Sequence, residues 1–283
     1  MTGEDRRVLL AALDDTPAAH DVLMTALGTA HLVGATVEVL HVAGGHHSAR
    51  IAAGAAGAAG VPLRVARGAV AETILGAMDD PTVVGAVVGT RAFRGGPRPA
   101  GSVARRVLAG ASKTVVFVPP DLRRPTADAP RRLLVPLDGS AEASAGFFEL
   151  ERELRPDVER EITVLLTFDG VRPAMLDHPV RDIPEWGREF LARYCPGERR
   201  TFQGRSGNPG DAVIEVADAT GSELIVLTSS GNIEGGHGAV VREVLTRSRV
   251  PVLVLPVPCR KARSDGTAVT SVSTTDSPFV TFN

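Results

Sequence analysis

The sequence has few of the residues on which several protein classes depend. Its 283 residues include two cysteines, Cys195 and Cys259, too few for a disulfide framework or a zinc site. Lys and Arg number 31 and Asp and Glu 33, so a net charge of −2 gives no reason to expect binding to nucleic acid or to a membrane surface. No apolar run is long enough to span a bilayer. No apolar signal segment precedes the first predicted strand, and we expect a cytoplasmic protein.

The motifs of common nucleotide-binding folds and of hydrolases are missing as well. No G-x-x-x-x-G-K-[ST] occurs, which excludes a P-loop NTPase, and the first strand is not followed by G-x-G-x-x-G. His46 and His47 have no carboxylate or cysteine close by in sequence, so a solvated loop is favoured over a metal site. No serine has a matching His–Asp arrangement. We therefore predict neither catalytic residues nor metal ligands.

What the sequence does contain is a regular alternation of strands and helices. Short β-branched runs at 7–13, 36–42, 63–66, 83–88 and 115–119 alternate with helical segments, a pattern typical of βαβ units and a parallel sheet. The first helical segment begins at Pro17, and Asp15 or Thr16 is expected to cap it. Gly34 is expected to end it.

The same pattern then occurs a second time. Residues 131–140 match residues 6–16 in charge, apolar run and terminal aspartate, and four prolines separate the two copies. We predict a first domain at 1–119, a linker at 120–130, a second domain at 131–258 and a disordered tail at 259–283. The second copy has a longer insert at 171–196, which contains the single Trp and the single Tyr; packing of Trp186 and Phe190 in the core is the expected role.

A glycine-bearing loop connects the fourth strand to the following helix. It runs from Gly89 to Gly101, contains Arg91, and leads into Ser102, which is well placed as an N-cap. One interpretation is a polyphosphate site made of backbone N–H groups at a helix N-terminus. The other is an ordinary strand–helix connection. The residues of the loop alone do not separate the two.

These residues resemble the universal stress protein family. The resemblance is carried by residues 134–140 (LVPLDGS), by Gly-Thr-Arg at 89–91 and Gly-Ser-Val at 101–103, and by a valine-rich final strand in each copy. It implies an α/β fold with two tandem doubly wound domains, each a five-stranded parallel sheet of order 3-2-1-4-5. It also implies that the final strands pair to form an intramolecular pseudo-dimer, and it leaves a further homodimer open.

The resemblance also implies a ligand and its site. It suggests a nucleotide-responsive regulator, not an enzyme, that binds ATP or a related adenine nucleotide with Mg²⁺ as counter-ion and responds through a protein partner. Its implied site residues in the first domain are Asp14, Val42, Gly89, Arg91, Gly101, Ser102 and Val103. Those of a weaker site in the second domain are Pro136, Asp138, Gly231 and Gly238.

The chain departs from the family pattern in both copies. Ala92 replaces the second glycine of the first loop, and in the second copy Thr228 replaces the first glycine and Ala239 the hydroxyl residue. A nucleotide-independent interaction scaffold is therefore a second hypothesis, and slow ATP hydrolysis a third.

Overall fold

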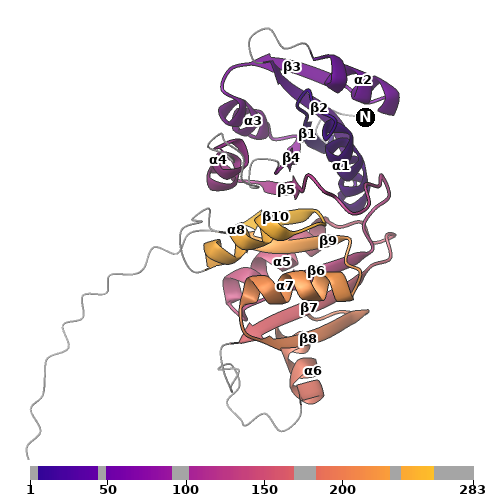
Figure 1. Cartoon of the computed structure of the whole chain (residues 1–283). Helices are drawn as coiled ribbons and strands as arrows, with labels where there is room; N and C mark the ends of the chain where they lie inside the picture. Colours follow the sequence, from indigo (N-terminus) through magenta and orange to yellow (C-terminus); the bar gives the residue numbers. More distant parts are fainter. Residues whose placement is uncertain (1–5, 44–48, 91–101, 169–182, 230–236, 258–283) are drawn as a thin grey trace, which may run out of the picture.

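The protein is described by a computed structural model that covers residues 6–43, 49–90, 102–168, 183–229 and 237–257 (Figure 1). Within each half, the described strands and helices alternate, and β5 is followed directly by β6. The elements of the first half are β1 (Val8–Ala12), α1 (Ala19–Val33), β2 (Thr36–Ala43), α2 (Arg50–Ala59), β3 (Leu63–Arg67), α3 (Val70–Met78), β4 (Val83–Gly89), α4 (Ser102–Gly110) and β5 (Thr114–Val118). Those of the second half are β6 (Arg132–Pro136), α5 (Ala141–Glu153), β7 (Glu161–Phe168), α6 (Ile183–Tyr194), β8 (Arg200–Ser206), α7 (Pro209–Ala219), β9 (Leu224–Ser229), α8 (His237–Arg247) and β10 (Val252–Pro256).

The ten strands of the described residues belong to one sheet. Its order is β3-β2-β1-β4-β5-β10-β9-β6-β7-β8, so each half has the predicted order 3-2-1-4-5. Strands within each half are parallel, whereas β5 and β10 pair antiparallel, with Val116 opposite Leu253. The expected pairing of the final strands is therefore confirmed, and it relates the two halves by a pseudo-twofold axis.

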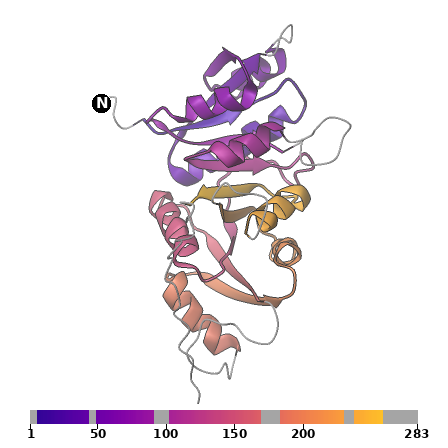
Figure 2. The ribbon, with the colours of Figure 1, turned by 90° about the vertical axis from the view of Figure 1, so that its left-hand side faces the viewer.

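Helices cover both faces of this sheet, and the strands alternate accordingly. Leu9 and Ala11 of β1 belong to a buried cluster with α1, α2, α5 and α6, and Val8 and Leu10 belong to a cluster with α3, α4, α7 and α8. Figure 2 shows the two helical layers of the second half on opposite sides of its strands. Each cluster contains residues from both halves, so the apolar core continues across the β5–β10 junction. Within the described residues, we find no helix with the length and apolar character that a membrane span requires.

The proline-rich connection between the halves packs against the first half. A Cβ atom added to Gly28 of α1 would lie 2.4 Å from the backbone oxygen of Asp128 and 3.2 Å from that of Thr126. Arg123 binds the second half, through its backbone N–H to the Arg249 oxygen (3.0 Å) and through an ion pair with Asp218. The predicted tail at 259–283 lies outside the described residues.

Replacing glycine by alanine inside a helix usually stabilises a protein, but at Gly28 we expect the opposite. Gly28→Ala is expected to lower the free energy of unfolding by about 1–3 kcal/mol, because the new methyl group collides with backbone that cannot rotate away. Gly57→Ala in α2, where a Cβ meets nothing within 4 Å, is the matched control and should raise it by about 0.5–1 kcal/mol. Urea unfolding of both variants measures the difference. A similar gain in both would contradict the close contact of the linker with α1.

Candidate functional site

The carboxyl ends of β1 and β4 lie side by side where the strand order reverses. In open α/β sheets, this switch point is the usual position of a ligand. The β1–β4 ladder runs as far as the pair Ala12 and Val88, so Gly89 and Asp14 both follow it within two residues. The structure thus brings these two predicted site residues to the same point of the same sheet edge.

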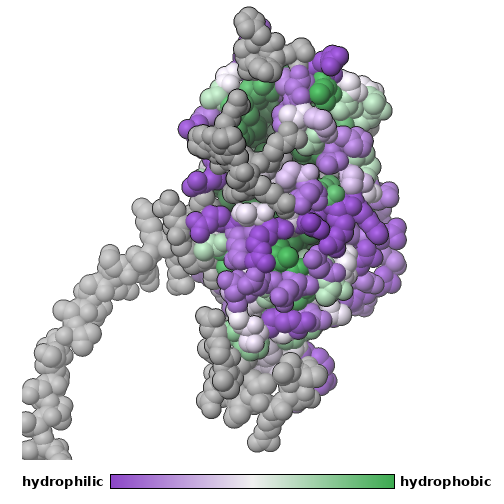
Figure 3. Space-filling model, in the orientation of Figure 1, coloured by the Kyte–Doolittle hydropathy of each residue, from purple (hydrophilic) through white to green (hydrophobic). Residues whose placement is uncertain are grey.

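Half-buried apolar side chains lie at this edge. Ala12 ends β1, and Val42 of β2 is the direct ladder partner of Ala66 of β3. All three pack on the buried cluster of the α3–α4 face, as does Val103, the second residue of α4. Figure 3 shows an apolar hollow on this half of the molecule. A lining of small apolar groups suits the face of a flat aromatic ring.

Asp14 is held at the rim of this edge by a local turn. Its side chain is exposed, and its Oδ1 atom accepts hydrogen bonds from the backbone N–H of Thr16 (3.2 Å) and from the Thr16 hydroxyl. An aspartate side chain that accepts the backbone N–H two residues further along the chain forms an Asx turn. The carboxylate is therefore fixed at the end of β1 while it stays accessible to solvent.

The prediction that Asp15 caps the following helix is wrong. α1 begins at Ala19, and its N-cap residue Ala18 receives no side-chain hydrogen bond. Asp15 Oδ1 instead accepts the backbone N–H of Ile51 (2.8 Å), in the first turn of α2. A carboxylate is favourable there because the helix dipole is positive at its N-terminus. The partners are 36 residues apart, so no local pattern could reveal the contact.

The chain leaves β4 in a fixed direction. Gly89 is the ladder partner of Val118, and both the backbone N–H (2.8 Å) and the hydroxyl (3.1 Å) of Thr90 donate to the Val118 oxygen. Thr90 is buried; in the sequence it belongs to the Gly-Thr-Arg motif at 89–91, but the motif assigns it no role of its own. Of the predicted loop, Arg91 and Gly101 lie outside the described residues, and Ser102 is the first residue of α4.

The second half has a turn at Asp138 like the one at Asp14, but its β6–β9 ladder is shorter than the β1–β4 ladder. Asp138 accepts the backbone N–H of Ser140 (2.9 Å), and the Ser140 hydroxyl caps α5 by accepting the N–H of Ala143. The β6–β9 ladder, however, ends at the pair Leu134 and Ile225, two residues before Pro136. Proline has no N–H to donate to a ladder, which explains this earlier separation. The switch point of the second half therefore has a different shape.

Two other predicted residues of the second half are less informative. Gly238 is a buried residue near the start of α8, and Gly231 lies outside the described residues.

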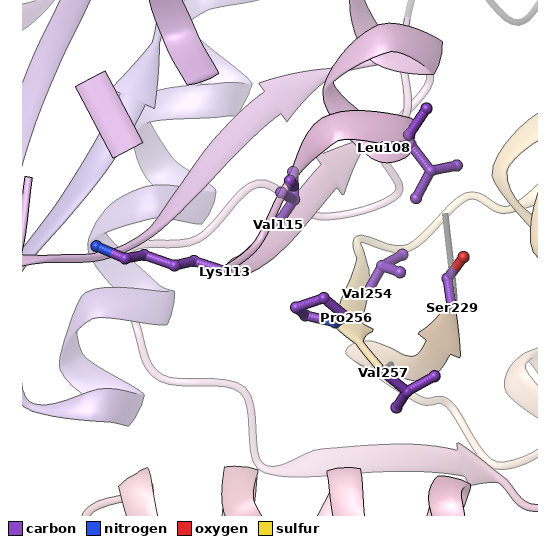
Figure 4. A pocket seen from close by; sticks show the side chains of 9 residues that line it. Leu108, Lys113, Val115, Ser229, Val254, Pro256 and Val257 are labelled. Carbon is purple, nitrogen blue, oxygen red and sulfur yellow. The ribbon is translucent and has the colours of Figure 1, made fainter. Parts of the chain in front are cut away.

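A small pocket lies between the two halves, beside the end of β9 (Figure 4). Most of its lining residues are of apolar types, among them Leu108, Val115, Val254, Pro256 and Val257, and the hydroxyl residue Ser229 also lines it. Lys113 also borders it, but its ammonium group points away and donates to the backbone oxygens of Asp80 (2.7 Å) and Val83 (2.8 Å). Without a charge directed into it, the pocket is not suited to a phosphate group.

The described part of the insert, from residue 183 on, contributes to the core, as expected for Trp186 and Phe190. Both are buried, and Trp186 packs edge-on against Phe202 of β8 with ring centroids 5.0 Å apart. Cys195 is buried next to them and accepts a hydrogen bond from Arg200 (2.7 Å). Burial raises the pKa of the Cys195 thiol to about 11. A neutral, enclosed thiol is poorly placed for nucleophilic chemistry.

The described part of the chain contains no group of three or more His, Cys, Asp or Glu side chains that could hold a metal ion. His46 and His47 lie outside it.

Comparison with known proteins finds a family match for part of the chain and structures with a similar fold. Residues 130–256 match the model of the universal stress protein family. A universal stress protein from Archaeoglobus fulgidus has 18% sequence identity and a TM-score of 0.62, and the match covers 89% of this chain and 97% of that one. A protein from Pseudomonas aeruginosa described under the same family name has 14% identity and a TM-score of 0.63, covering 90% and 94%.

Two further comparisons are less informative. A universal stress protein in complex with cAMP matches with 19% identity and a TM-score of 0.34, covering 46% of this chain and 98% of that one, too low a likeness to bear on the ligand here. No curated protein sequence matches. The second half of the chain is thus similar to the universal stress protein family, and the first half repeats its strand order.

Proposed function

We propose that this protein is a stress regulator that binds ATP or a related adenine nucleotide in its first half. The observation that supports this most directly is the combination of features at the carboxyl ends of β1 and β4. The half-buried side chains of Ala12, Val42 and Ala66 offer an apolar surface to a base, and Asp14 lies at its rim. A carboxylate at that position can accept hydrogen bonds from ribose hydroxyls.

The phosphate groups would lie toward Gly89 and the N-terminus of α4. Backbone N–H groups at a helix N-terminus favour an anion, and a glycine lets the ligand approach the backbone closely. Mg²⁺ would accompany the phosphates as counter-ion. Asp15 is not available as a second carboxylate for that ion, because it caps α2. Val103, directly after Ser102, would complete the apolar lining from α4.

Calorimetric titration of ATP with Mg²⁺ into the intact chain tests this function. We expect one saturable site per chain, with affinity about tenfold lower in Asp14→Ala, because a hydrogen bond to a charged group is lost. Ser102→Ala should weaken binding in the same direction. Asp138→Ala, the matched change in the second half, should alter the affinity by less than about twofold.

Two other results would contradict the proposed function or its position in the first half. No heat at millimolar ATP, together with an unchanged melting temperature, would contradict nucleotide binding and favour the interaction scaffold. A loss of affinity in Asp138→Ala as large as the one expected here for Asp14→Ala, with little change in Asp14→Ala, would show that the site was placed in the wrong half. Release of inorganic phosphate over hours, measured in the same samples, distinguishes hydrolysis from binding.

A further inference from the structure

The core of the first half contains one buried histidine. His41, in β2, is 3% exposed, and its Nδ1 atom lies 2.9 Å from the backbone oxygen of Leu13. Because a carbonyl oxygen can only accept a hydrogen bond, Nδ1 is the donor. The Nε2 atom is buried and has no hydrogen-bond partner among the described residues, which favours the neutral ring with its single hydrogen on Nδ1.

The hydrogen bond of His41 joins β1 and β2 beyond the end of their ladder. The last ladder pair is Ala12 and Leu40, and the backbone N–H of Leu13 then donates to the Leu40 oxygen (3.0 Å). His41 donates to the oxygen of the same Leu13, so both polar backbone atoms of this residue are bound to β2. The next residue is Asp14, the carboxylate of the candidate site.

The imidazole of His41 lies on the face of the sheet opposite the proposed ligand surface. Leu40 and Val42, its neighbours in β2, pack in the cluster of the α3–α4 face, whereas Val39 belongs to the cluster with α1 and α2. Residues two apart along a strand share a face, so His41 is on the side of Val39. It would therefore act on a ligand through the backbone of Leu13 and not by contact.

The second half keeps the backbone contact but not the histidine. The N–H of Leu137 donates to the Leu165 oxygen (2.8 Å), as Leu13 does to Leu40. The residue after Leu165 is the buried Leu166, which therefore takes the position of His41. A leucine side chain has no hydrogen to donate, so β6 and β7 lack this second link. The replacement also shows that leucine fits this position of the fold.

We propose that His41 is a positioning residue for nucleotide binding, because its hydrogen bond to Leu13 fixes the end of β1 and with it the gap between Asp14 and Val42. The inference rests on the proposed function and deepens it, since it assigns part of the difference between the halves to one buried side chain. A gap whose two sides are linked loses less conformational freedom when a ligand enters, and this raises the affinity.

Two substitutions separate this hydrogen bond from the bulk of the ring. His41→Asn keeps an N–H donor at the place of Nδ1 but leaves a gap, whereas His41→Leu fills much of the space and has no donor. We expect His41→Leu to bind ATP about three- to tenfold more weakly than the unsubstituted chain, and His41→Asn to stay within about twofold of it. The melting temperatures should follow the opposite order, with His41→Asn the less stable variant.

Affinity and stability thus rank the two variants in opposite orders, which a general loss of structure cannot produce. Leu166→Asn is the matched control, since it leaves a gap at the same position of the second half and should lower the melting temperature without changing the ATP affinity. If His41→Leu bound ATP as tightly as the unsubstituted chain, or if Leu166→Asn lost as much affinity as His41→Leu, this inference would be overturned.

Proton–nitrogen NMR of the chain with isotope-labelled histidine tests the hydrogen bond itself, without a ligand. The chain has seven histidines, and the signal of His41 is the one that is missing in His41→Leu. We expect the ring hydrogen on Nδ1; a ring that carries it on Nε2 would overturn this inference alone. Absence of ATP binding by the unsubstituted chain would overturn the proposed function itself.

Discussion

Truncating Glu151 to alanine is expected to lower the free energy of unfolding by about 3 kcal/mol. Glu151 of α5 forms an ion pair with Arg200 of β8 at 2.5 Å, with side-chain exposures of 19% and 7%. The Arg200 guanidinium also lies over the Phe147 ring, 5.9 Å from its centroid, and donates to Cys195. Without the carboxylate, a buried positive charge would lack its counter-charge. Urea unfolding followed by far-UV circular dichroism measures the loss.

The same helix supplies the control for this prediction. Glu149 pairs with Arg152, but these side chains are 73% and 76% exposed, so Glu149→Ala should change stability by less than about 0.5 kcal/mol. Glu151→Gln should lose about half as much as Glu151→Ala, because the amide oxygen can still accept a hydrogen bond from Arg200 but carries no charge. Equal effects at positions 149 and 151 would show that Arg200 finds solvent or another partner once Glu151 is removed.

A change in the first half is expected to alter the unfolding of the second. Phe117 of β5 is fully buried and pairs with Val252 of β10, within a cluster that contains residues of both halves. Phe117→Ala should lower stability by about 3–5 kcal/mol. Because the core is shared, the midpoint seen by fluorescence of Trp186, the single tryptophan and a residue of the second half, should fall together with the midpoint seen by circular dichroism.

The control is a smaller change in the first half, away from the junction. Ile74→Val in α3 removes one buried methylene and should cost about 1 kcal/mol, with both probes again moving together. If the Trp186 midpoint stayed constant in Phe117→Ala while circular dichroism resolved two transitions, the halves would unfold independently. The β5–β10 pairing would then be a contact between separate units and not part of a common core.

Much of the fold follows from local residue patterns. Short β-branched runs between amphipathic segments predict parallel βαβ units, because strands covered on both faces must be apolar throughout. The duplication is visible in residues such as Asp14 and Asp138, and Gly34 ends α1 in the left-handed conformation as expected. The strand order and the pairing of the final strands came from the family resemblance, and the structure agrees with both.

The candidate site could be predicted only in part. Asp14 and Gly89 each follow a buried strand, and the carboxyl ends of neighbouring parallel strands necessarily share one edge. The roles of Asp15 and Thr90 were missed, because their partners, Ile51 and Val118, are distant in sequence.

The sequence by itself determined the repeat and the α/β class, and with the family resemblance it predicted a ligand at the carboxyl edge of the sheet. The repeat and the class depend on residue periodicity and on chain connectivity, which are local properties. Only the tertiary structure decided how the two halves differ at that edge. Asp15 accepts the backbone N–H of Ile51 in α2, whereas Ser140 caps α5, the helix that follows it directly. Which helix end lies within reach is set by packing across the whole core, and no segment of the sequence specifies it alone.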